Sequence, residues 1–146
     1  MHRMLITIAA VVLLGGGLAN LFWPNALESY IATRIDWRAS VAIPVARIAA
    51  LIEVCAAIGL LVLVRSPFAH ALAAFVFLAF LLVHTFEFVN GQPATCPCAA
   101  GMGEVLPPRL VHLLLGLFSA IMSAVLLSLV IQVSPFFGKD PLHVEA

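Results

Sequence analysis

The residues best suited to chemistry are two cysteines separated by a single proline, Cys96 and Cys98. A disulfide between two cysteines one residue apart forms only a small ring, which strains the bond. Strained disulfides are more oxidising and more easily exchanged than ordinary ones. The spacing therefore predicts thiol–disulfide exchange. Three alternatives stay open: two free thiols in a loop, a fixed disulfide from one of them to Cys55, and Cu(I) binding by the thiolates with Met102 nearby.

A second group of candidates consists of titratable side chains inside apolar segments. Glu53 lies about nine residues past Pro44 in such a segment, roughly 14 Å farther along the helix, where a bare carboxylate costs several kcal/mol. We therefore expect its carboxyl to be neutral, paired or facing a cavity. His84 and Glu87 share one helix face and can reach Arg47 or His112 across a bundle. They suggest a proton relay or an orienting network beneath the cysteines; alternatively, Arg47, Glu87 and His112 extend to the membrane interface.

These polar residues are unevenly distributed along the apolar segments. All of them fall in the half of an antiparallel bundle that faces the cysteine pair, whereas the opposite half carries little beyond Ser128 and Gln132. Cys55 points away from Glu53 on a helix, and we expect it to be a small buried apolar group. The candidate chemistry is therefore concentrated at one end of the molecule.

The composition shows which elements must position these residues. Of the 146 residues, 64% are hydrophobic and only 10% are charged, unlike a soluble protein. Seven Lys and Arg residues balance seven Asp and Glu residues, so no excess charge points to nucleic acid. A bilayer core needs about 20 apolar residues per helix, and the segments 4–22, 41–64, 68–89 and 110–133 meet that length. We expect an all-α polytopic four-helix bundle in a lipid bilayer, one membrane domain over 1–146 with an unstructured tail from 134 to 146.

The connections between these segments add further detail. The link at 65–67 leaves room only for a tight turn, so the second and third segments should be antiparallel neighbours. In the first connection, apolar residues recur at helical spacing, at Leu27, Tyr30, Ile31 and Ile35. This spacing predicts a short helix along the membrane surface, and an irregular polar loop is the alternative.

Small residues form candidate packing faces at 15–17, Gly59 and Gly116. Glycine lets a neighbouring helix backbone approach closely in lipid, so the run at 15–17 predicts a packing surface. Such faces also allow another function, in which the chain is a non-enzymatic assembly subunit of a larger membrane complex. The first segment in addition resembles a cleavable secretory signal, although we expect a retained helix.

The orientation in the membrane follows from the cysteines, because basic residues are spread over both sides and do not decide it. Paired thiols are most useful where disulfides persist, in the periplasm or an equivalent oxidising space. We therefore expect an integral protein of the bacterial inner membrane, with both termini cytoplasmic and the segment holding Cys96 and Cys98 periplasmic.

A resemblance to a known family rests on the order of several features. Glu53 is followed six residues later by Gly59, the third segment runs into Asn90 and Gly91, and a Cys-x-Cys motif precedes the fourth segment. Over nearly the whole chain this order resembles the MauE and DoxX group of small membrane proteins, and most closely the methylamine utilisation protein MauE. The family's motif reads Cys-Gly-Cys-Phe-Gly, whereas this chain has Pro97 between the cysteines, which stiffens the pair.

The resemblance implies thiol and disulfide chemistry on the outer side of the membrane. Cys96 and Cys98 match the family's cysteine motif, and Glu53 matches its intramembrane acid. The implied function is a thiol–disulfide relay or maturation factor that acts on a periplasmic thioredoxin-like protein or a disulfide-rich client. No cofactor is predicted; besides the copper alternative, the DoxX side of the resemblance implies a quinone-coupled oxidoreductase subunit with a pocket near Glu53 and His84.

Overall fold

The computed structural model describes residues 2–23, 25–34, 38–90 and 107–133, and these form five helices without a strand. The helices are α1 (His2–Phe22), α2 (Asn25–Arg34), α3 (Ala39–Val62), α4 (Pro67–Asn90) and α5 (Pro108–Val133). All except α2 are long and apolar enough to cross a membrane. The prediction of an all-α membrane bundle is confirmed, and the chain is an integral membrane protein. The tail predicted over 134–146 lies outside the described residues.

The long helices expose large apolar side chains on the outside of the bundle. Examples with more than half of their surface exposed are Val11, Val62, Val89 and Leu117, one on each long helix. Water would solvate such a surface poorly, whereas lipid tails solvate it well. A helix also satisfies its own backbone hydrogen bonds in hydrocarbon, so these sequences form helices and leave apolar faces to the bilayer.

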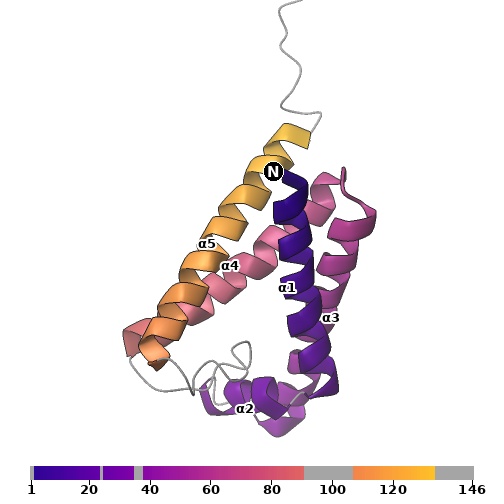
Figure 1. Ribbon diagram of the computed structural model, residues 1–146. Helices are drawn as coiled ribbons and strands as arrows, with labels where there is room; N and C mark the ends of the chain where they lie inside the picture. The colour runs from indigo at the N-terminus through magenta and orange to yellow at the C-terminus, as the bar shows by residue number, and fades with distance from the viewer. Residues whose placement is uncertain (1, 24, 35–37, 91–106, 134–146) are drawn as a thin grey trace, which may run out of the picture.

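The long helices associate as two pairs. α1 packs along α3 and α4 packs along α5, whereas contacts between the pairs are fewer. Figure 1 shows that the pairs lie close together where α1 begins and α5 ends, and diverge toward α2. We call this second end, where α1 and α4 finish and α3 and α5 begin, the α2 end. α1 begins and α5 finishes at the opposite end of the bundle, because the four long helices run in alternating directions.

An apolar core joins the four long helices in the half away from α2. Its members are mostly small or medium side chains that are almost fully buried, among them Ala9, Leu13, Ala57, Phe77 and Leu126. In lipid, the close packing of such side chains stabilises helix association through van der Waals contact. The core therefore holds the two pairs together at the end opposite the polar candidates.

A tight turn joins α3 to α4, as the short link predicts. The Ser66 amide donates a hydrogen bond to the Leu63 carbonyl oxygen at 2.8 Å, and Nδ1 of the His70 ring lies 2.8 Å from the Ser66 carbonyl oxygen. A Cβ on Gly59 would lie 3.4 Å from the Ala69 side chain, so the two helices touch here. They are antiparallel neighbours at the turn, but Figure 1 shows them separating beyond it.

α1 and α3 approach each other closely at Gly17. A Cβ there would lie 2.8 Å from Cγ2 of Val54 and 3.0 Å from the carbonyl oxygen of Ala50. Gly15 faces open space, because nothing lies within 4 Å of its Cβ position. The chain's own helices therefore occupy the small-residue faces at Gly17 and Gly59, which the assembly-subunit alternative reserves for a larger partner.

The short helix predicted after the first segment is present as α2. Ile31 is buried against Ala42 and Ala46 of α3, with Tyr30 partly buried beside them. These contacts hold α2 across the end of the bundle (Figure 1). Ile35, the last apolar residue of the predicted pattern, lies outside the described residues.

Candidate functional site

Buried polar side chains gather between the apolar core and the α2 end. Among those no more than 4% exposed are Asn20, Glu53, His84, Glu87 and His112. They come from all four long helices, so the uneven distribution seen in the sequence is also a spatial one. Burial of a polar group costs free energy unless the group is hydrogen-bonded, so the hydrogen-bond partners of these side chains determine the cost of burying them.

His84 and His112 face each other across the interface of α4 and α5, and we call them the histidine pair. Their Nδ1 atoms are 3.3 Å apart and their ring centroids 5.6 Å apart. Because a neutral imidazole ring carries one N–H, one Nδ1 atom donates a hydrogen bond and the other Nδ1 atom accepts it. His112 is thus a partner across the bundle, whereas the Arg47 side chain is exposed. Such a pair can hand a proton from ring to ring.

Glu87 links α4 to the surface helix α2. The Tyr30 hydroxyl donates a hydrogen bond to Oε1 of Glu87 at 3.0 Å, and Glu87 is only 1% exposed. Glu87 follows His84 by three residues, so both side chains leave the same face of α4. The hydrogen bond therefore ties α2 to the helix face that carries half of the histidine pair.

Glu53 lies in the other helix pair, between α3 and α1. Its carboxyl hydrogen-bonds to the side chain of Asn20, while its Oε2 is buried with no hydrogen-bond partner among the described residues. Gly16 makes room for it, since a Cβ there would lie 3.4 Å from Oε2. An unpaired carboxylate oxygen in an apolar interior is costly, so the site suits a neutral carboxyl. Glu53 and His84 therefore occupy different interfaces.

The two cysteines of the exchange motif, Cys96 and Cys98, lie outside the described residues, as does Met102 of the copper alternative. They belong to the connection between Asn90, the last residue of α4, and Pro108, the first residue of α5. Both of these helix ends lie at the α2 end of the bundle (Figure 1). The buried polar groups of α4 and α5 are thus close in sequence to the segment that carries the thiols.

Cys55 does not have the environment that we expect from the sequence. Its thiol is free and exposed on α3, not buried. Cys55 and Glu53 point in different directions, as residues two apart on a helix must. The direction away from α1 leads to the outside of the bundle, because α3 has neighbours on only part of its surface. The thiol therefore faces lipid partway along a membrane-spanning helix.

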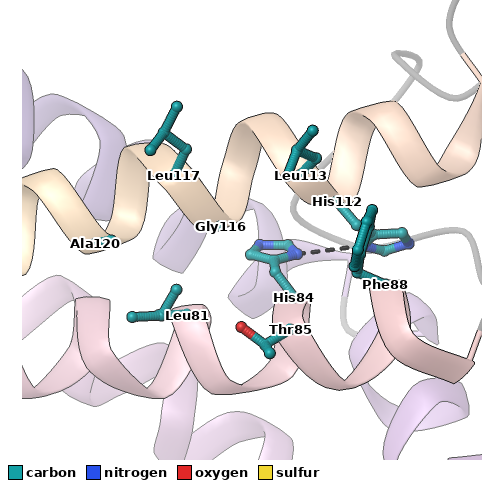
Figure 2. A pocket seen from close by; sticks show the side chains of 9 residues that line it. All are labelled: Leu81, His84, Thr85, Phe88, His112, Leu113, Gly116, Leu117 and Ala120. Carbon is teal, nitrogen blue, oxygen red and sulfur yellow. Dashed lines mark hydrogen bonds between the residues drawn. The ribbon is translucent and has the colours of Figure 1, made fainter.

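A groove runs along the outside of the bundle between α4 and α5, over the histidine pair. It has a volume of about 340 Å³, and its walls are mostly apolar, with Leu81 on α4 and Leu113 and Leu117 on α5. Figure 2 shows the His84 ring between the two helices near Gly116, where the missing side chain leaves room. The histidine pair and Thr85 are therefore the polar part of an otherwise apolar groove.

The described residues provide hydrogen bonding and proton exchange. In that part of the chain, no group of three or more His, Cys, Asp or Glu side chains is arranged to hold a metal ion. The histidine pair supplies two ring nitrogens and Glu53 one carboxyl, in separate interfaces. The copper alternative depends on residues outside the described ranges.

Comparisons with known proteins add no identification. No protein-family model, no curated protein and no solved structure matches this chain. The resemblance to the MauE and DoxX group, which rests on Glu53, Gly59 and the cysteine motif, therefore stays a prediction.

Sequence alone does not single out Asn20, the hydrogen bond of Tyr30 or the buried His70. Asn20 follows Gly17 by three residues on one helix face, and a polar residue beside a glycine packing surface is a usable signal. Tyr30 is typical of an interfacial aromatic residue, and nothing in its spacing indicates Glu87. His70 is buried in the otherwise apolar end, where its ring bonds to the preceding turn.

Proposed function

We propose that this chain is a membrane-embedded thiol–disulfide relay or maturation factor, similar to MauE, that works through Cys96 and Cys98. The observation that carries the proposal is the position of the thiol segment in the chain. It connects two helices whose adjoining turns bury the histidine pair and Glu87. Disulfide exchange needs thiolates and therefore proton acceptors, and the bundle supplies buried proton-exchanging groups in the helix turns that precede and follow that segment in the sequence.

The exchange takes place in two balanced steps. The thiolate of one cysteine attacks a sulfur of the partner's disulfide, that S–S bond breaks, and the partner's second sulfur leaves as a thiolate that takes up a proton. The other cysteine then attacks the mixed disulfide, which releases the reduced partner and leaves Cys96 and Cys98 joined. The partner gains two electrons and the pair loses two. The same steps in reverse pass a disulfide to a client.

The proposed location is the bacterial inner membrane, with both termini in the cytoplasm and the thiols in the periplasm. The fold supports this arrangement, because the start of α1 and the end of α5 share one end of the bundle and the thiol segment leaves from the other. Disulfides persist in the periplasm and are reduced in the cytoplasm. A periplasmic thioredoxin-like protein or a disulfide-rich client is the proposed partner.

Single cysteine variants will trap the exchange intermediate. In a Cys55→Ser background, Cys96→Ser or Cys98→Ser will accumulate a mixed disulfide with a periplasmic partner, because the thiol that resolves it is missing. The product is a heavier band on non-reducing gels that disappears with reductant. The double variant will form no such band and will lose client oxidation.

Cys55→Ser alone is the matched control, since this thiol faces lipid on α3 and should leave the exchange unchanged. Client oxidation that continues at the normal rate in the variant lacking both Cys96 and Cys98 would rule the proposal out.

A further inference from the structure

The groove between α4 and α5 has an exposed arginine at the end nearest α2. Arg109 precedes His112 by three residues and Leu113 by four, so its side chain leaves the face of α5 that lines the groove. It is the second residue of α5, where the membrane span of this helix begins. The groove therefore has a positive charge at the membrane surface and mostly apolar walls below it.

The polar side chains of the groove can all donate a hydrogen bond to a ligand. Thr85 is exposed in the groove, and neither Thr85 nor Arg109 is hydrogen-bonded or ion-paired within the described part of the chain. His84 bonds to His112 through Nδ1, and Figure 2 shows its second ring nitrogen on the side away from His112, toward Gly116. When His112 donates within the histidine pair, this second nitrogen carries the proton of His84. The groove therefore suits a ligand with several acceptor oxygens and a negative charge.

The rest of the groove fits an acyl chain. It extends from His112 to Ala120, roughly 12 Å along α5 at a rise of about 1.5 Å per residue, with Leu81 on the facing wall. Its volume of about 340 Å³ is within the range of small-molecule sites. Leu113 and Leu117 border it on the outer face of the bundle, at 50% and 58% exposure. A chain from the surrounding bilayer can therefore enter the groove sideways, without passing through water.

We propose that this groove binds one anionic phospholipid. Its phosphate contacts Arg109, its ester oxygens accept hydrogen bonds from Thr85 and His84, and one acyl chain lies against the apolar walls. A guanidinium at headgroup depth binds phosphate strongly. An anionic headgroup fits better than a zwitterionic one, which brings a cation of its own close to Arg109. The site consists of described residues alone and does not depend on the thiol relay.

Photocrosslinking in vesicles tests the site. The purified chain is placed in phosphatidylcholine vesicles with a trace of phosphatidylglycerol that carries a diazirine on one acyl chain, and mass spectrometry locates the crosslinked residues. We expect the crosslinks to concentrate on the groove walls, for example at Leu117 and Ala120, and to decrease when unlabelled phosphatidylglycerol is added. Phosphatidylcholine with the same diazirine should label the exposed faces of all four long helices without this preference.

Two variants with matched controls test the two ends of the groove. Arg109→Gln should lower the apparent affinity for phosphatidylglycerol about tenfold through the lost charge-assisted contact, and Arg109→Lys should keep most of it. The control is Arg38→Gln, because Arg38 is an exposed arginine at the start of α3 and does not line the groove. Ala120→Phe fills the inner end and should also weaken binding. Its control is Leu82→Phe, because Leu82 is 64% exposed on α4 and lies outside the groove.

Ordinary contact with the bilayer would give a different result. Equal labelling of the groove by the two phospholipids, or equal effects of Arg109→Gln and Arg38→Gln, would overturn the proposal. A free fatty acid is the other anionic amphiphile to compare: diazirine-labelled palmitate that labels the groove and is not displaced by phosphatidylglycerol would overturn the assignment to a phospholipid. The variant lacking both Cys96 and Cys98 should be labelled as wild type is, so the lipid site and the thiol relay can fail separately.

Discussion

A Gly17→Val variant will unfold at a markedly lower denaturant concentration than wild type, whereas Gly15→Val will resemble wild type. At Gly17 a new Cβ would meet Val54 at 2.8 Å and the Ala50 carbonyl oxygen at 3.0 Å, so α1 has to move away from α3. Overpacking of this kind lowers the free energy of unfolding by about 1–3 kcal/mol. Dodecyl sulfate titration in mixed micelles, followed by circular dichroism, measures the change.

Gly15 is a close control because both glycines lie in α1 and both changes add the same β-branched side chain. No atom lies within 4 Å of the Cβ position of Gly15. Equal destabilisation by the two variants would mean that the cost comes from the backbone of α1 and not from its contact with α3. A graded series with Gly17→Ala should show a smaller loss, since only the Cβ is added.

Replacing Glu53 by leucine will destabilise the α1–α3 pair, whereas Glu53→Gln will not. Leucine leaves the buried side chain of Asn20 without its hydrogen-bond partner, at a cost of about 1–3 kcal/mol in the free energy of unfolding. Glutamine keeps the size of the side chain and an oxygen that can accept a hydrogen bond. It is also neutral, and we expect the Glu53 carboxyl to be neutral because its Oε2 is buried and unpaired. The same denaturant titration compares the two variants.

A double-mutant cycle identifies the contact that is lost. Combining Glu53→Leu with Asn20→Leu should cost less than the sum of the single changes, because the double variant leaves no buried polar group unpaired. Additive losses would show that Glu53 and Asn20 do not stabilise each other. A Glu53→Gln variant as unstable as Glu53→Leu would contradict the neutral, hydrogen-bonded carboxyl.

Much of the fold is predictable from the sequence, because the bilayer leaves few choices. A long apolar run must form a helix in hydrocarbon, so the existence and approximate length of α1, α3, α4 and α5 follow from composition. Their pairing does not follow. Apolar residues surround each helix, so periodicity does not reveal which face packs. The short turn at 65–67 correctly predicts that α3 and α4 are neighbours. However, α3 makes more extensive contact with α1, and α4 makes more extensive contact with α5.

The candidate site is predictable only where a single helix sets the geometry. The spacing of His84 and Glu87 indicates one shared face, and both are buried. Contacts across the bundle depend on helix rotation, so the sequence offers both Arg47 and His112 as partners of this face, and gives no indication of the Tyr30 bond to Glu87. The exposure of Cys55 could not be predicted for the same reason, because the rotation of α3 in the bundle decides which of its side chains face another helix.

The membrane side and redox state of the two thiols test the central claim directly. In intact cells that make the Cys55→Ser variant, a membrane-impermeant maleimide should label Cys96 and Cys98 from the periplasmic side. Labelling should rise after treatment with a reductant, because during exchange a fraction of the molecules have Cys96 and Cys98 joined in a disulfide, which maleimide does not label. Labelling only from the cytoplasmic face of inverted vesicles, or labelling that neither reductant nor oxidant changes, would contradict the account.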